Sequence, residues 1–105
     1  MEVIQPILID KTLDYIDNLI FKAKIKINGE YKDFEVFKTI KKENAIRKYL
    51  YVEDEIGVIE EAQLFTNQGE VLAIKPYSIE KQLDGLVLTF EFKITVEETN
   101  LGYIE

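Results

Sequence analysis

The feature that most constrains this chain is the period-two alternation of apolar residues over positions 86–96. An α-helix would spread these residues around its circumference, whereas a period of two places them on one face of a β-strand. At about 3.3 Å per residue, a strand of this length reaches roughly 36 Å, which is longer than most strands. The pattern predicts a long central strand with one dry face, formed by Leu86, Leu88, Phe90, Phe92, Ile94 and Val96.

A hairpin is predicted around Asn28-Gly29, between residues 19–27 and 30–40. Both turn residues tolerate the positive φ that a type I′ turn requires. Counting outward from the turn pairs Ile27 with Glu30 and Ala23 with Phe34. This register sets Lys22 against Glu35 and Lys24 against Asp33, and opposite charges across a ladder are stabilising. The other face then carries Phe21, Ala23, Ile25, Ile27, Phe34 and Val36.

Further strands are predicted along the rest of the chain. Residues 45–52 favour a strand over a helix because Tyr49, Tyr51 and Val52 are strand formers. Residues 58–65 and 70–74 flank a turn at 66–69 with Gly69 in the left-handed region, and the second of these strands should end at 75–77. Residues 78–82 are either one helical turn or a short edge strand. We therefore expect one domain over residues 1–105, an all-β antiparallel sandwich or partly open barrel with at most one or two short helical turns.

The two ends of the chain carry apolar residues without a clean period. In the N-terminal arm, residues 1–17, Pro6 suits the start of an edge strand over residues 7–9, and Asp10 or Thr12 could cap a helical turn over 14–17. The arm packs within the chain or docks on a neighbouring copy. The C-terminal tail, residues 99–105, is a second apolar segment. The predicted interface residues are Ile4, Ile7, Leu8, Ile9, Leu101, Tyr103 and Ile104.

Composition disfavours most catalytic chemistry. The chain has no cysteine and no histidine, which removes thiol nucleophiles, imidazole bases and the usual zinc ligands. Its net charge of −7 argues against binding to a nucleic-acid backbone. The pattern shows no membrane span and no secretory signal, so we expect a soluble non-enzymatic protein made in the cytoplasm, with no cofactor. A small basic cluster is interpreted as a solvated surface, and consists of Lys38, Lys41, Lys42, Arg47 and Lys48.

Negative charge and tyrosines offer two weaker possibilities. The acidic residues at 53–55, with Glu60 and Glu61, do not match the calcium-loop pattern. The net charge of −7 would suit an acidic inhibitor or decoy that occupies a basic site on a target protein, although lysines are interleaved with the carboxylates along the chain. Tyrosines on a shared exposed face would suit a carbohydrate-binding sandwich. The candidates for that face are Tyr31, Tyr49, Tyr51 and Tyr77.

Residues 56–77 resemble a segment of phage tail-fibre and baseplate-associated attachment domains. The likeness lies in a Gly-containing strand leading to an apolar pair, Leu64-Phe65, then a polar turn with Gly69, and Glu-Val-Leu-Ala before Pro76. In that family the segment is a β-hairpin of a small, non-enzymatic domain that forms oligomers. The turn here lacks the family's usual acidic residues. The resemblance implies a component of a phage-like tail, located in the virion, whose partners are protein subunits of the same assembly.

Overall fold

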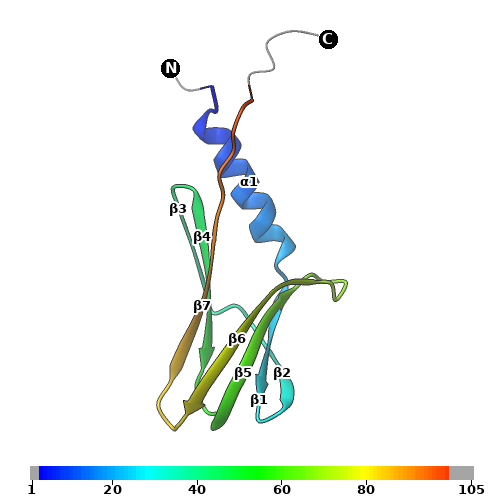
Figure 1. The fold of residues 1–105 in the computed structure, drawn as a ribbon, viewed down its shortest axis with the longest axis vertical. Helices are drawn as coiled ribbons and strands as arrows, with labels where there is room; N and C mark the ends of the chain where they lie inside the picture. The colour runs from blue at the N-terminus through cyan, green and yellow to red at the C-terminus, as the bar shows by residue number, and fades with distance from the viewer. Residues whose placement is uncertain (1–2, 100–105) are drawn as a thin grey trace.

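A computed structural model describes residues 3–99, which form one helix and two antiparallel sheets (Figure 1). Sheet A has the strand order β2-β1-β5-β6 and sheet B the order β3-β4-β7. The predicted all-β sandwich is confirmed, and the sheets do not close into a barrel. The elements are α1 (Pro6–Leu19), β1 (Lys22–Ile27), β2 (Glu30–Phe34), β3 (Lys38–Lys42), β4 (Ala45–Val52), β5 (Gly57–Phe65), β6 (Val71–Lys81) and β7 (Leu86–Lys93).

The β1–β2 hairpin has the predicted register, with Ile27 opposite Glu30 and Ala23 opposite Phe34. Asn28 and Gly29 both have positive φ, 50° and 81°, as a type I′ turn requires. The inner positions of β1 are buried, which confirms the predicted face. Phe21 is the exception: it precedes β1 at the end of the sheet and is 52% exposed.

The main core lies between the two sheets. Strand β4 alternates as predicted, with Leu50 and Val52 buried on the inner face and Arg47 and Tyr51 exposed on the outer face. Sheet A covers this inner face with the buried positions of β1 and β5. The core cluster consists of Ala23, Ile25, Ile27, Leu50, Val52, Ile59, Ala62, Leu64, Leu88 and Phe90.

The single strand predicted over residues 30–40 is wrong. The chain leaves sheet A after Phe34 and enters sheet B at Lys38. Val36 packs against the core during this crossing, and the Phe37 amide donates to the Tyr49 carbonyl at 2.8 Å. Alternation alone could not reveal the crossing, because Phe34 at the end of β2 and Val36 in the crossing both pack against the core and so continue the period of two.

Two boundaries in the second half also differ. Strand β6 continues through Pro76 to Lys81, since β6 is an edge strand and needs no ladder donor on its free side. Strand β7 is an edge strand of sheet B, so the predicted central position is wrong. It ends at Lys93, which pairs with Ala45, the first residue of β4. The apolar alternation over residues 86–96 therefore continues past the last residue of β7 that pairs with β4.

The predicted edge strand over residues 7–9 is wrong, because this segment lies in the 14-residue helix α1. Pro6 occupies the first turn of the helix, where its fixed φ is favourable and its missing N–H costs nothing. The helix begins after Gln5, upstream of the predicted caps Asp10 and Thr12. It is longer than the one or two turns expected from the sequence.

Helix α1 packs against β4 and extends the second layer beyond the end of sheet A (Figure 1). Leu13 and Ile46 are fully buried but lie outside the main core cluster. The upper half of sheet B is thus covered by a helix and the lower half by a sheet. The molecule is elongated, with extents of 59 × 26 × 23 Å.

Candidate protein interface

Helix α1 is fixed to sheet B along one side by ion pairs. Asp10, Asp14 and Asp17 follow one another at helical spacing, so their carboxylates lie on one side of α1. The Lys41 ammonium lies 2.9 Å from the carboxylate of Asp10 and 2.5 Å from that of Asp14. The hydrogen bonds that Lys41 donates, first to Asp14 and then to Asp10, raise the pKa of Lys41 to about 12. The charge of Lys41 therefore persists throughout the physiological pH range.

Lys48 makes the third link between α1 and the sheet. Its side chain points inward from β4 and is 4% exposed, so the interpretation of this residue as solvated is wrong. The ammonium donates to the Asp17 carboxylate and, at 2.9 Å, to the Thr39 hydroxyl. A buried ammonium without an anionic partner has a high desolvation cost. The ion pair with Asp17 offsets this cost for Lys48.

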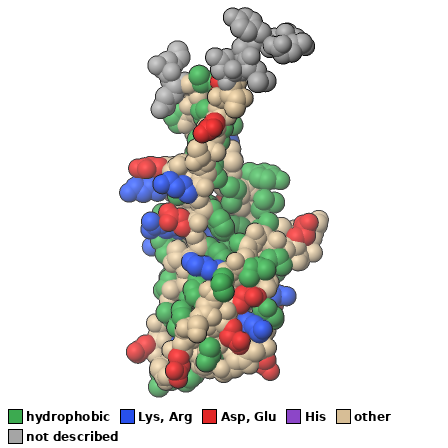
Figure 2. All heavy atoms as spheres, in the orientation of Figure 1, with side chains coloured by type: hydrophobic (Ala, Val, Ile, Leu, Met, Phe, Trp, Pro, Cys, Tyr) green, Lys and Arg blue, Asp and Glu red, His purple; other side chains and the backbone are tan. Residues whose placement is uncertain are grey.

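Helix α1 carries two apolar stripes, one that faces the sheet and one on a neighbouring side of the helix. Ile9 and Ile16, with Leu13 between them, form the inner stripe; the two isoleucines are half-buried. Leu8 and Tyr15 are seven residues apart and therefore share a second stripe, which faces solvent. Their exposed fractions are 46% and 66%. Figure 2 shows hydrophobic side chains gathered along one flank of α1.

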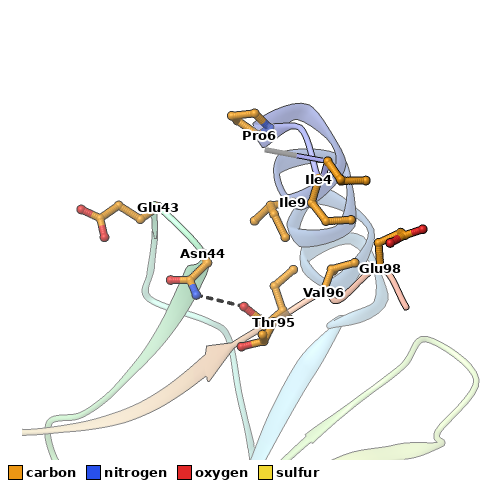
Figure 3. Close-up of a pocket in the computed structure, with 10 residues that line it drawn as sticks. Ile4, Pro6, Ile9, Glu43, Asn44, Thr95, Val96 and Glu98 are labelled. Atoms are coloured by element: carbon orange, nitrogen blue, oxygen red, sulfur yellow. Dashed lines mark hydrogen bonds between the residues drawn. The ribbon is translucent and has the colours of Figure 1, made fainter. Parts of the chain in front are cut away.

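Two predominantly apolar grooves border α1 in the part of the chain that the structure describes. The larger, about 890 Å³, lies between the N-terminal part of the helix and the segment that follows β7. Ile4 and Ile9 line it from one side, and Ile94 and Val96 from the other (Figure 3). The smaller, about 490 Å³, lies where the end of α1 meets β6 and β7. Its apolar lining residues are Ile16, Leu19, Ile20, Leu72, Phe92 and Ile94.

The predicted interface residues that the structure describes occupy two different environments. Ile7 and Leu8 are exposed on α1, at 63% and 46%. Ile4 and Ile9 are half-buried and line the larger groove. The structure thus brings the four N-terminal residues to one end of the molecule. The three C-terminal ones, Leu101, Tyr103 and Ile104, lie outside the described residues.

Sequence analysis missed two contributors to this surface. Tyr15 was not singled out, although its seven-residue spacing from Leu8 is a helical signal. Leu72, 40% exposed on edge strand β6, joins the surface only through the fold. No sequence pattern could have placed it beside the end of α1.

Glu60 and Glu61, two of the most closely spaced carboxylates in the sequence, serve the fold of sheet A. Glu60 accepts a hydrogen bond from the Gly29 amide at 2.6 Å, and Glu61 accepts one from the Tyr31 hydroxyl at 2.6 Å. The Tyr31 bond raises the pKa of that phenol, and together with a bond from Gln63 it lowers the pKa of Glu61. Within residues 3–99, no group of three or more acidic residues is placed to hold a metal ion.

The tyrosines considered for sugar binding do not share one face. Tyr31 is exposed on sheet A, whereas Tyr49 and Tyr51 lie on the outer face of sheet B. Tyr77 packs against the main core. The remaining surface therefore offers no tyrosine platform among these four residues.

Comparisons with protein-family models, with curated proteins and with solved structures found no significant match. Across the part of the chain that the structure describes, no helix has both the length and the apolar character needed to cross a membrane.

Proposed function

We propose that this chain is a non-enzymatic structural subunit that assembles with copies of itself through the exposed face of α1, as a component of a phage-like tail or baseplate. The observation that carries the proposal is the pair of apolar stripes on one helix, of which the sheet covers only one. A helix held on one side by a body and apolar on another side is suited to a protein partner.

The position of α1 supports this role. The helix extends past sheet A, so a partner could approach Leu8 and Tyr15 without meeting the sandwich (Figure 1). Asp10, Asp14 and Asp17 are already paired with lysines of the same chain. Their charges would therefore oppose the close approach of a second copy less than free carboxylates would.

The phage-tail assignment rests on the likeness of residues 56–77 to an attachment-domain hairpin. This segment spans β5, the turn at Thr66–Gly69 and the first half of β6. A virion location and subunit partners within a tail follow from that likeness, and they belong to the proposal.

The test is the solution mass of the whole chain by light scattering over a concentration series. The variant Leu8→Gln/Tyr15→Gln replaces two exposed apolar side chains by glutamine, which is itself a good helix former. We expect its association constant to fall at least tenfold, because each side chain contributes roughly 1.5–3 kcal/mol when fully buried. Leu83→Gln is the matched control, because it removes an exposed apolar side chain from the loop between β6 and β7, away from α1, and it should leave association unchanged.

Circular dichroism should show that all three proteins remain folded. A wild-type chain that stays monomeric at every concentration, or a Leu8→Gln/Tyr15→Gln variant that associates like the wild type, would contradict the proposal.

A further inference from the structure

The segment that follows β7 is an extended chain without a partner strand. The period-two pattern continues past Lys93, with Ile94 and Val96 half-buried and Thr95 and Glu97 exposed. The Ile94 amide donates to the Asn44 carbonyl at 2.9 Å, and the Asn44 side-chain amide donates to the Ile94 carbonyl at 2.9 Å. After these two hydrogen bonds between Ile94 and Asn44, residues 95–99 have no backbone hydrogen bond to any other described residue. This segment therefore presents open donors and acceptors.

Strand β3 presents the complementary feature on the other edge of sheet B. It pairs only with β4, and all five of its residues are exposed. The register places Lys38 opposite Tyr49 and Lys42 opposite Ala45, on the outer face of the sheet. Lys41 points to the other face, where it binds α1. Figure 2 shows basic side chains gathered at this edge.

The two edges carry opposite charges that the chain itself leaves unpaired. Lys38 and Lys42 have no ion-pair partner among residues 3–99, and the same holds for Glu97 and Glu98. Lysines at a sheet edge ordinarily discourage pairing with further strands. An acidic strand is the kind that such an edge would accept, because opposite charges across a ladder are favourable.

We infer that residues 95–99 of one copy add as a strand to the free edge of β3 of the next copy, with Glu97 on the outer face between Lys38 and Lys42. Strand addition to an exposed sheet edge supplies main-chain hydrogen bonds, and the side chains supply specificity. Pairing of segment 95–99 with itself is disfavoured, since it would bring glutamates of the two copies together.

The contact joins two different surfaces, so it is heterologous: each copy gives a strand and receives one. Such contacts close into a ring when the rotation between copies allows it. The inference rests on the proposed function, because both require self-association. It differs in its residues, which lie on the sheet edges and not on the exposed stripe of α1.

The experiment uses three charge-reversed forms of the whole chain. The donor variant is Glu97→Lys, the acceptor variant is Lys38→Glu/Lys42→Glu, and the third form combines all three changes. Glu53→Lys is the control, because it changes net charge as much as the donor variant does, at an exposed loop away from both edges.

We expect each edge variant to associate at least tenfold more weakly than the wild type at low salt. The three-change form, and an equimolar mixture of donor and acceptor variants, should recover association because opposite charges face each other again. The control should stay within about threefold of the wild type. Edge variants that associate normally, or a three-change form as weak as its parents, would overturn the inference.

Hydrogen exchange reports on the backbone pairing itself. The amides of residues 95–99 should exchange at least tenfold more slowly in the assembled than in the dilute wild-type chain, and unchanged exchange would overturn strand addition. If Leu8→Gln/Tyr15→Gln weakens association while the edge variants do not, only this inference fails. If the wild type never associates, the proposed function fails with it.

Discussion

The ion pair between Lys48 and Asp17 makes a prediction in which the two partners behave differently when removed. Lys48 is 4% exposed on the inner face of β4, whereas the Asp17 side chain on α1 is 43% exposed. Asp17→Asn leaves a buried ammonium without its anion. Lys48→Met instead replaces the ammonium by an apolar group of similar length and leaves Asp17 able to contact water. We therefore expect the change at the more exposed residue to be the more damaging one.

The magnitude follows from burial. Removing one partner of a fully buried ion pair costs about 3–5 kcal/mol, because the other charge stays buried. Water already screens part of the Asp17 carboxylate, so we take about half of that, roughly 1.5–2.5 kcal/mol, for Asp17→Asn. Replacing a buried charge by a well-packed apolar group is often neutral or stabilising, so Lys48→Met should change the free energy of unfolding by no more than about 1 kcal/mol.

The assay is urea unfolding followed by far-UV circular dichroism on both single variants and on Asp17→Asn/Lys48→Met. The double variant should be more stable than Asp17→Asn alone, because the stranded charge is gone. In a domain of this size, Asp17→Asn should lower Tm by roughly 8–15 °C. If Lys48→Met is as destabilising as Asp17→Asn, the buried charge contributes net stability and the reasoning is refuted.

Three further predictions concern sheet A and the packing of α1. The Tyr31–Glu61 hydrogen bond should stabilise the fold fully between the ordinary pKa values of 4.5 and 10.0; this contribution is lost as pH falls through the lowered pKa of Glu61 or rises through the raised pKa of Tyr31. Absorbance titration against Tyr31→Phe and unfolding across pH measure both limits. Gly57→Ala should cost about 3 kcal/mol or more in urea unfolding, because φ is 143° and the added Cβ would overlap the side-chain amide of Asn28; Asn28→Gly in the same chain should recover part of the loss. Leu13→Ala should cost about 2–4 kcal/mol in the same assay, since Leu13 is fully buried.

Each of these has a clear contrary outcome. A Tyr31 phenol that titrates with the freely exposed tyrosines would argue against the bond to Glu61. A tolerated Gly57→Ala would mean that the turn moves away from the Asn28 side chain at little cost. A Leu13→Ala variant as stable as the wild type would show that α1 does not pack on β4 as described.

Local pattern was sufficient for the parts of the fold that local chemistry determines. Asn28-Gly29 sets both the turn and the register of β1–β2, because a one-residue slip would move the whole apolar set to the wrong face. Residues 45–52 were placed correctly as a strand, although Lys48 was interpreted as solvated and in fact points inward. In both segments, propensity and alternation favour the same structure.

Helix α1 was missed because both of its apolar stripes obscure the period. A helix with one apolar side shows a clear spacing of three and four residues. In residues 6–19 a second stripe through Leu8 and Tyr15 fills the gaps, so the segment lacked an evident pattern. The pairing of Asp10, Asp14 and Asp17 with Lys41 and Lys48 depends on tertiary structure, and no spacing within either segment predicts it.

The same contrast between pattern and partner applies at the end of β7. The alternation from Leu86 to Val96 is continuous, but its pairing in sheet B stops at Lys93 because β4 has no residue left to offer. Here the alternating segment is longer than the strand it pairs with, so part of its apolar face is buried while its backbone lacks ladder hydrogen bonds. This is ordinarily a structural conflict. In a protein that assembles, the conflict disappears once a neighbouring copy supplies the missing strand. Residues 94–96 therefore continue the strand pattern where β4 no longer offers a partner. An intermolecular sheet would explain this difference between the sequence pattern and the structure of the single chain.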